Sequence, residues 1–353
     1  MRVKVAFLET DKNYLQRIVT ALSSKYADKL QLYSYTDKEA AIAALRSERI
    51  AVLVCTTGFE LTADELPANC GLAYLTDSMD VASYQGHPAI CKFQKAEQIY
   101  KGILSVYAET SASSAAVRYQ SGSMAMVILV TSPSGGGGAS SVAAGLARRL
   151  ALRGSRVLYL NYEKLGMSDI YFNGPGQQGM SDVIFAIKSH RGNLRMKVES
   201  CARQDESGVY YFAAPAIALD IMELSADEEL ELMDTVAKSD SYDYVIVDRA
   251  FGMGEDDIKV MNKAHRVFWV VEGTAGGVTK ASRAYTAFDI MAKRTELPFL
   301  RQLVCFYNKY EAGRSAQVEQ GPDMSGSIPR FAISDARALT ERIAQVEDLD
   351  YIL

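Results

Sequence analysis

Residues 131–141, with the sequence TSPSGGGGASS, have the composition of a phosphate-binding loop. They follow the apolar run 126–130 and precede a helical pattern that places Val142, Leu146 and Leu150 on one face. Successive glycines can turn their NH groups into a concave nest, and the next helix adds its free NH groups and the positive end of its dipole. The order of strand, glycine loop and helix therefore predicts a cradle for a polyphosphate.

The loop resembles the deviant Walker A motif of the ParA/MinD ATPases, which reads proline, lysine, two glycines, any residue, glycine, lysine and two Ser/Thr residues. The residues that match this pattern are Pro133, Gly135, Gly136, Gly138, Ser140 and Ser141. Ser134 and Ala139 stand where the family has its two lysines. A glycine-rich loop can also be a simple turn, so the interpretation depends on other motifs in the chain. The resemblance implies that a nucleotide contacts Ser134, Gly135, Gly136, Gly137, Gly138, Ala139, Ser140 and Ser141.

Two later segments resemble the catalytic switches of the same family. A short apolar strand leads into Asn161 and Glu163, which occupy the place of the switch I Asp-x-Asp pair that helps to order magnesium and the attacking water. A second strand resembles Walker B and ends in Asp248. An aspartate at a strand end is more often structural, but its order relative to the loop favours a functional role. The resemblance makes Asn161, Glu163 and Asp248 the catalytic candidates, and Ser140 and Asp248 the expected ligands of Mg²⁺.

Two further strands, 267–271 and 303–307, continue the alternation of strands and helices. Such an alternation requires a parallel sheet with helices on both faces, and ligands bind at the carboxyl ends of its strands. The resemblance covers residues 124–353 and implies a P-loop NTPase domain of the ParA/MinD type. In that family an asparagine, here the one before Lys309, reads the adenine edge, and a later segment closes over the base. The implied base contacts come from Asn308, Pro329, Arg330 and Phe331.

The chain before residue 109 contains a second alternating pattern. Its strands are expected at 3–8, 30–35, 50–55, 72–76 and 88–93, with helices between them. Five strands and five helices in this length resemble the receiver domain of response regulators, a flavodoxin-like α/β fold with a five-stranded parallel sheet. The expected organisation is a receiver-like domain at 1–108, a Ser- and Ala-rich linker at 109–123 and a nucleotide-binding domain at 124–353.

The receiver chemistry is incomplete in the N-terminal domain. A receiver needs an acidic pair for magnesium, an aspartate that accepts the phosphoryl group and a lysine that steadies it. Glu9 and Asp11 fit a remnant of the acidic pair. Thr76 and Lys92 fall where the switch threonine and the lysine belong, but the sequence Cys-Thr-Thr at 55–57 occupies the acceptor position. The domain is therefore interpreted as a pseudo-receiver that acts by docking or dimerisation.

Composition limits the partners and the compartment. A chain of 353 residues with 48% hydrophobic and 23% charged positions is expected to form two globular domains. The formal net charge of -5 argues against a general nucleic-acid-binding protein, and the basic residues between 188 and 203 are interpreted as a solvated helix face rather than a surface for DNA or a partner. Five separated cysteines and three scattered histidines indicate reduced thiols and no metal site built from these residues. With neither a signal peptide nor a long apolar run, the expected location is cytoplasmic, with at most peripheral membrane association.

A pseudo-receiver joined by a linker to a ParA/MinD-type domain resembles the TadZ/CpaE proteins of tight-adherence (Flp) pilus systems. The resemblance covers the whole chain. It implies a homodimer that binds ATP or ADP with Mg²⁺, is located at the cell pole and contacts other components of the pilus secretion machinery. It implies no specific nucleic-acid partner.

The missing lysines bear more on hydrolysis than on binding. One charge-assisted hydrogen bond is worth about 1.5–3 kcal/mol, or about ten- to 150-fold in affinity. A cation placed on transition-state charge is worth on the order of 10³–10⁵ in rate. We therefore expect nucleotide binding with weak or absent hydrolysis.

Two alternative functions stay open. A cycling ParA/MinD-like ATPase would need a replacement cation, such as Arg249, which is otherwise expected as a surface residue of a switch loop. A phosphorylation-dependent response regulator would need an acceptor aspartate, which residues 55–57 do not offer.

Overall fold

The computed structural model describes residues 2–110, 124–190 and 193–352. The described residues up to 110 form one compact unit with those of 185–201, and the other described residues form a second unit. The predicted linker at 109–123 therefore lies almost entirely outside the described residues. None of the helices in the described ranges is both long enough and apolar enough to span a membrane.

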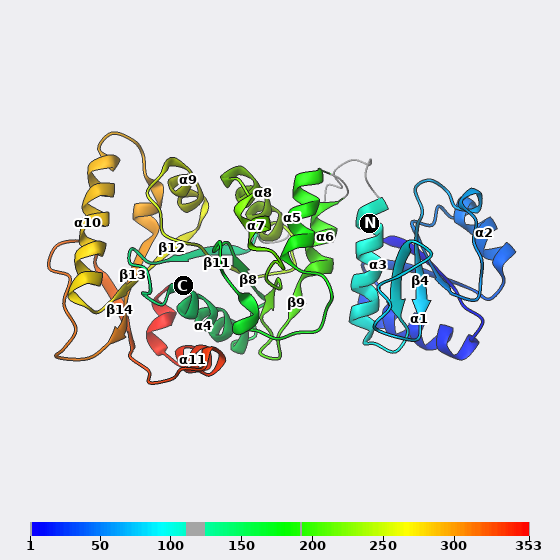
Figure 1. Ribbon diagram of the computed structural model, residues 1–353, viewed down its shortest axis with the longest axis horizontal. Coiled ribbons are helices and arrows are strands. Elements are labelled where there is room, and N and C mark those ends of the chain that lie inside the picture. Colours follow the sequence, from blue (N-terminus) through cyan, green and yellow to red (C-terminus); the bar gives the residue numbers. More distant parts are fainter. Residues whose placement is uncertain (1, 111–123, 191–192, 353) are drawn as a thin grey trace. The chain divides into compact units, whose positions relative to one another are not determined.

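Alternating strands and helices build the first unit (Figure 1). Its elements are β1 (Val3–Leu8), α1 (Lys12–Tyr26), β2 (Leu30–Tyr35), α2 (Lys38–Ser47), β3 (Val52–Thr56), the 3₁₀ turn η1 (Ala63–Glu65), β4 (Gly71–Thr76), β5 (Ser83–Tyr84), β6 (His87–Cys91), α3 (Ala96–Thr110) and α6 (Leu194–Cys201). The described strands form a sheet of order β2-β1-β3-β4-β6-β5. All pairs are parallel except β5 with β6. The predicted receiver-like sheet of five parallel strands is confirmed.

Both faces of this sheet are buried, as a parallel sheet requires. Val5 and Phe7 of β1 pack with α1 and α3 in one hydrophobic cluster, and Ala6 and Leu8 pack with α2 in another. The alternation of side chains along the strand thus supplies both halves of the core.

The expected five helices are not all present in the first unit. Within residues 2–110, only the turn η1 follows β3, and a hairpin of β5 and β6 follows β4. Gly58 and Pro67 interrupt the segment after β3 and disfavour a helix there. Gln85 and Gly86 have φ of 49° and 80°, which suits the tight turn of a hairpin.

Helix α6 packs on α3 within the first unit. Val198 and Cys201 of α6 are buried. Lys197 is only 6% exposed, because its ammonium donates to Ser105 and pairs with Glu109 of α3 at 3.1 Å. The interpretation of the basic segment 188–203 as a solvated helix face is therefore wrong at Lys197.

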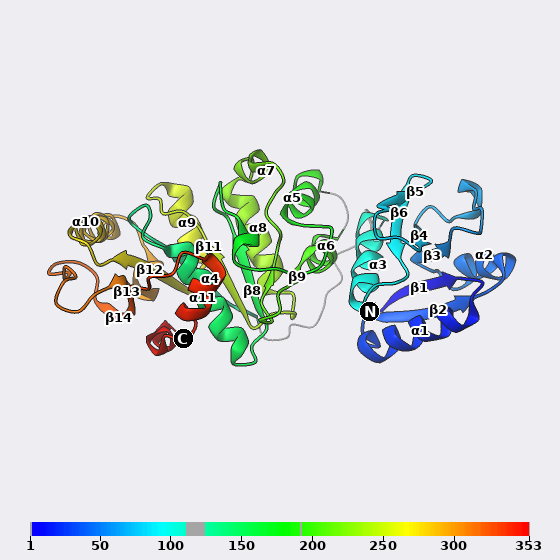
Figure 2. The same ribbon diagram turned by 60° about the horizontal axis from the view of Figure 1, so that its bottom comes forward.

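The second unit is organised around a larger sheet (Figure 2). Its strands are β7 (Met126–Thr131), β8 (Val157–Asn161), β9 (Arg203–Gln204), β10 (Tyr210–Tyr211), β11 (Tyr244–Asp248), β12 (Arg266–Glu272), β13 (Leu303–Tyr310) and β14 (Met324–Pro329). Its helices and 3₁₀ turns are α4 (Ala139–Leu152), η2 (Ser168–Ile170), α5 (Met180–Ser189, which begins in this unit), α7 (Ala218–Met222), α8 (Ala226–Ala237), α9 (Glu255–Lys263), α10 (Ala275–Ala292), η3 (Pro298–Gln302), α11 (Ala336–Ile343) and η4 (Glu347–Ile352). The described strands have the order β14-β13-β12-β7-β11-β8-β10-β9, with only β9 antiparallel to its neighbour.

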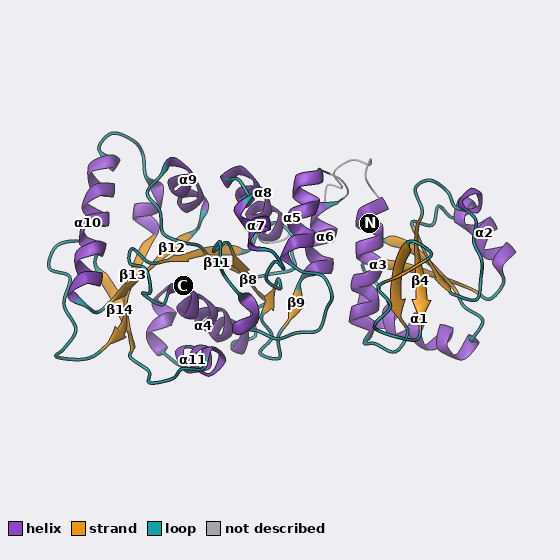
Figure 3. Ribbon diagram, viewed as in Figure 1, coloured by secondary structure: helices purple, strands orange, loops and turns teal. Residues whose placement is uncertain are grey.

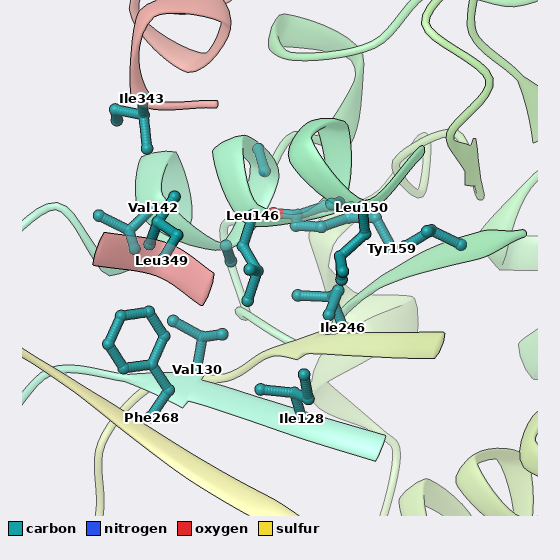
Figure 4. Close-up of a cluster of buried hydrophobic side chains, with 14 of the residues drawn as sticks. Ile128, Val130, Val142, Leu146, Leu150, Tyr159, Ile246, Phe268, Ile343 and Leu349 are labelled. Carbon is teal, nitrogen blue, oxygen red and sulfur yellow. The ribbon is translucent and has the colours of Figure 1, made fainter. Parts of the chain in front are cut away.

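Helices cover both faces of the larger sheet. Helices α4 and α11 lie on one face, and α8, α9 and α10 lie on the other (Figures 1 and 3). Val142, Leu146 and Leu150 of α4 are almost fully buried against a cluster that includes Ile128 and Val130 of β7 (Figure 4). Full burial of such a side chain contributes about 1.5–3 kcal/mol. This packing fixes the start of α4, and with it the preceding glycine loop.

Candidate functional site

The glycine loop between β7 and α4 has the backbone of an anion nest. Gly136 and Gly138 have φ of 74° and 88°, whereas Gly135 and Gly137 lie outside the left-handed region, so the handedness alternates along the loop. Such alternation turns successive NH groups toward one concave side. Gly138 is the N-cap residue of α4 and offers no side-chain cap, and the NH groups of Gly138 and Ala139 donate to no acceptor in the described chain. Free donors are thus available in the predicted cradle.

Ser132 anchors the base of the loop. Its hydroxyl donates to the carbonyl oxygen of Val270 in β12 at 2.7 Å, and it accepts from the NH of Ser134 at 3.3 Å. Ser134 is folded inward and is only 6% exposed. The residue at the place of the family's signature lysine therefore belongs to the internal packing of the loop.

Asn308 is buried against the same loop. Its Nδ2 donates to the carbonyl oxygen of Gly137 at 2.7 Å. A Cβ at position 138 would come within 2.5 Å of this Nδ2, so the close approach requires glycine there. The predicted base-reading residue thus lies at the site, with its amide bound to the loop.

Asp248 lies where three strand ends meet. In the sheet it is in register with Val130 of β7 and Asn161 of β8. Its carboxylate is fully buried, and Oδ2 accepts a hydrogen bond of 2.6 Å from the Tyr159 hydroxyl. Burial and the nearby charge of Glu163 raise the pKa of Asp248 to about 7, while the bond from Tyr159 opposes this shift. The carboxylate therefore changes its charge near neutral pH and would gain from a nearby cation.

The surroundings of Asp248 fit a divalent cation. Its Oδ1 is buried and has no hydrogen-bond partner, which is uncommon for a native carboxylate. The Ser140 side chain, in the first turn of α4, interacts with the carboxylate and favours its charged form. Carboxylate and hydroxyl oxygens are hard ligands of the kind that Mg²⁺ takes together with water and phosphate oxygens. Within the described ranges no cluster of three or more His, Cys, Asp or Glu could hold a metal, so water and phosphate would complete the shell.

Asn161 and Glu163 lie at the same sheet edge. The Oδ1 of Asn161 accepts from the NH of Glu163 at 2.8 Å, which makes an Asx turn at the end of β8. Glu163 is near enough for its charge to act on the pKa of Asp248. This segment can therefore contribute a carboxylate through Glu163, whereas Asn161 shapes the turn and cannot act as a base.

Arg249 is neither a free cation nor an exposed switch residue. Its guanidinium lies 2.9 Å from Glu229 of α8 and 2.6 Å from Asp257 of α9. The side chain is only 15% exposed. Both interpretations that the sequence suggested for Arg249 are wrong, because it is held by helices on the sheet face opposite α4 (Figure 1).

The segment expected to close over the base lies at the end of β14, an additional parallel strand. Pro329 ends β14, and Arg330 pairs with Glu311 at 2.7 Å. Phe331 packs at the edge of the core, with the guanidinium of Arg342 5.8 Å from its ring centre. In the described chain neither Arg330 nor Phe331 bonds to the glycine loop, so their contact with a base stays a prediction.

The first unit has an ion pair where a receiver would carry its phosphorylation site. Lys92 lies 2.8 Å from a carboxylate oxygen of Glu9 and donates to the Thr56 hydroxyl at 3.2 Å. Burial raises the pKa of Glu9, but the bonds to Lys92 and to backbone NH hold it below its usual value. Asp11 is the N-cap of α1, and burial raises the pKa of the Cys55 thiol to about 12. Cys55 therefore offers no thiolate at neutral pH, and the end of β3 carries no aspartate.

Two residues at the site escape sequence reasoning. Tyr159 reads as a core residue of an apolar strand, although its place two residues before Asn161 puts both on one strand face. The sequence gives Lys309 no role beyond following Asn308, but its ammonium lies 2.8 Å from the carbonyl oxygen of Gly136.

Comparisons with known proteins agree with this arrangement. Residues 1–108 match the family described as TadZ-like, receiver domain. A ParA family ATPase from Chlorobium tepidum TLS superposes with a TM-score of 0.51 at 18% identity, over 65% of this chain and 98% of that chain. Two weaker likenesses are to a chain of the MinC:MinD cell division protein complex of Aquifex aeolicus (TM-score 0.46, 19% identity, 62% and 86% covered) and to the septum site-determining protein MinD complexed with Mg-ADP from Pyrococcus horikoshii OT3 (0.47, 15%, 63% and 95%). No curated protein matches the sequence.

The fold is that of a receiver-like domain followed by an α/β domain similar in fold to the ParA/MinD proteins. The match of the N-terminal domain carries this further. The chain is similar to the TadZ/CpaE proteins: it joins a TadZ-like receiver domain at residues 1–108 to a C-terminal domain with the fold of a ParA family ATPase.

Proposed function

We propose that this protein binds ATP or ADP with Mg²⁺ and acts as a dimeric localisation or assembly factor of a tight-adherence (Flp) pilus secretion system at the cell pole. Hydrolysis is weak or absent. The observation that carries the proposal is a glycine loop with two free NH groups, close to a buried aspartate whose Oδ1 has no hydrogen-bond partner, in a loop that has no lysine. The proposed organisation is a pseudo-receiver at 1–108, a linker at 109–123 and a nucleotide-binding domain at 124–353.

Nucleotide binding is supported by groups that do not depend on the missing lysines. The NH groups of Gly138 and Ala139 would hold phosphate oxygens, and Ser140 and Asp248 would hold the ion. A bound Mg²⁺ would neutralise charge on the phosphates. Its positive charge would also keep Asp248 ionised at neutral pH.

Weak hydrolysis is supported by what the glycine loop and the two switch segments lack. Ser134 is packed inside the loop, Ala139 has no charge, and Arg249 is held by two carboxylates on the other face of the sheet. Asn161 cannot serve as a base, which leaves Glu163 as the carboxylate of the switch segment.

Assembly without turnover needs only that the nucleotide bind one state better than another. Differential binding shifts the population toward that state, and hydrolysis would matter only for release. The ion pair of Glu9 with Lys92 supports a docking role for the first unit rather than phosphorylation. The TadZ-like receiver domain supports partners within a pilus secretion system.

Calorimetric titration with MgATP tests the binding proposal. Ser140→Ala should lower the magnesium-dependent affinity about tenfold, because it removes one ligand of the ion. Ser24→Ala, which removes an exposed hydroxyl on α1, is the matched control and should bind as the wild type does. Light scattering during the same titration should show the dimer. If no adenine nucleotide binds below about millimolar concentration, the loop is only a turn and the proposal is wrong.

A further inference from the structure

A lysine reaches the glycine loop from a different strand. The Nζ of Lys309 donates to the carbonyl oxygen of Gly136 at 2.8 Å and lies 3.0 Å from a carboxylate oxygen of Glu272. A Cβ built on Gly138 would lie 4.0 Å from the Cε of Lys309. The side chain therefore runs beside the residue that caps α4, where the free NH groups of the nest are.

We propose that Lys309 is a nucleotide-binding residue that directs toward the polyphosphate the positive charge that the loop itself does not provide. Ser134 and Ala139 leave the loop without a cation of its own, and Arg249 is held elsewhere. The inference rests on the proposed nucleotide function. It adds a phosphate-binding residue that lies outside the loop motif.

The backbone of β13 explains how Lys309 is aimed. Along a regular strand, neighbours such as Asn308 and Lys309 point to opposite faces. The pairing of β13 with β14 shifts register between Tyr307 and Tyr310, and Lys309 has φ of 54°. A non-glycine residue in the left-handed region is strained, and bulges of this kind re-aim side chains beside active sites. As a result, both Asn308 and Lys309 contact carbonyl oxygens of the same loop.

The present partners of Lys309 can be exchanged for phosphate. The side chains of Lys309 and Glu272 are 37% and 22% exposed, and an ion pair this open to solvent is weak. Lysine has a flexible four-carbon stem, so its ammonium can move without a change in the strand. A polyphosphate carries several negative charges close together and competes well with one carboxylate.

Titration of the full chain with ATP and with adenosine tests this inference. Lys309→Gln should weaken ATP binding about ten- to 150-fold, the loss expected for one charge-assisted hydrogen bond, and should leave adenosine binding unchanged. Lys309→Arg should retain most of the affinity for ATP. Glu272→Gln removes the competing carboxylate and should tighten ATP binding by up to about fivefold. Lys293→Gln, which breaks an exposed pair with Asp289 on α10, is the matched control and should change neither ligand.

The outcomes separate this inference from the proposed function. If the wild type binds no ATP, the proposed function fails and the role of Lys309 fails with it. If the wild type binds ATP and Lys309→Gln binds it equally well, only the role of Lys309 is overturned. An equal loss of ATP and adenosine affinity would mean that Lys309 supports the loop rather than the phosphates, which also overturns the inference. A true charge effect should shrink as salt is raised from 50 to 300 mM, because ions screen exposed charges at this range (Debye length about 10 Å at 0.1 M).

Discussion

Replacement of Asp248 by asparagine should stabilise the nucleotide-free protein at neutral pH and weaken its binding of magnesium. The pKa of Asp248 is about 7 in the folded chain, because the carboxylate is fully buried, and about 3.9 in an unfolded chain. Because the folded carboxyl group binds its proton more tightly than the unfolded one, protonation of Asp248 stabilises the folded state. This contribution to the free energy of unfolding is complete below about pH 4 and is lost as the pH rises through about 7. About three pKa units at about 1.4 kcal/mol each give a loss of about 4 kcal/mol by pH 8.

Urea unfolding followed by tryptophan fluorescence can measure this loss. Trp269 is the single tryptophan of the chain and is fully buried in β12, so its emission reports on the second unit. In EDTA and without nucleotide, the unfolding free energy of Asp248→Asn should exceed that of the wild type by a margin that grows by about 2–3 kcal/mol from pH 5 to pH 8. An asparagine can still accept the bond from Tyr159, so the difference isolates the charge.

Two further variants sharpen the measurement. Tyr159→Phe removes a hydrogen bond that lowers the pKa of Asp248, so the pKa of Asp248 should rise in this variant. The decrease of its unfolding free energy with pH should therefore continue to a higher pH than in the wild type. Asp289→Asn removes an exposed carboxylate of α10 and controls for the loss of one negative charge. Saturating MgATP should stabilise the wild type and not Asp248→Asn. If the unfolding free energies of the wild type and Asp248→Asn change with pH in parallel, Asp248 is not a buried carboxylate with a raised pKa and this reasoning is refuted.

Two other predictions concern the loop and the first unit. Ala139→Lys should tighten ATP binding about ten- to 150-fold in a titration. Ser134→Lys should instead lower the midpoint of unfolding, because position 134 is packed inside the loop. Equal gains in ATP affinity from both variants would show that the loop is more open than described. Incubation with acetyl phosphate should add no phosphate to residues 1–108 by mass spectrometry, because Cys55 and Thr56 end β3 where an acceptor would be; an acid-labile adduct there would contradict the docking role.

Strands were readable from the sequence wherever an apolar run ended sharply. β1 has the expected bounds because Glu9 follows its apolar run at once, and β11 ends in Asp248 as expected. β2 also has the expected bounds, although Gln31 and Ser34 lie within it. Helices were less readable, since the segments after β3 and β4 are long enough for a helix but contain breakers and a hairpin turn. The burial of Lys197 depends on the packing of α6 against α3, which no local sequence pattern indicates.

The sequence predicts the site where a polar residue ends a strand or where a helix follows the glycine loop. Asn161 and Asp248 come together because parallel strands end at one sheet edge, and Ser140 joins them from the first turn of α4. The position of Lys309 depends on a register shift between two strands, and a one-residue change of register is invisible in a single sequence. Arg249 follows Asp248 directly, but its side chain is held by Glu229 and Asp257 on two separate helices.

The central claim is that the loop holds a nucleotide without turning it over. The most direct measurement mixes the full-length protein with one equivalent of ATP and Mg²⁺, separates bound from free nucleotide on a desalting column after an hour, and identifies the bound species by chromatography. We expect most of the nucleotide to elute with the protein, still as ATP. Recovery of free nucleotide only would contradict binding. Formation of ADP and phosphate at about one turnover per minute or faster, lost in Asp248→Ala, would show a working ATPase and contradict the proposed weak hydrolysis.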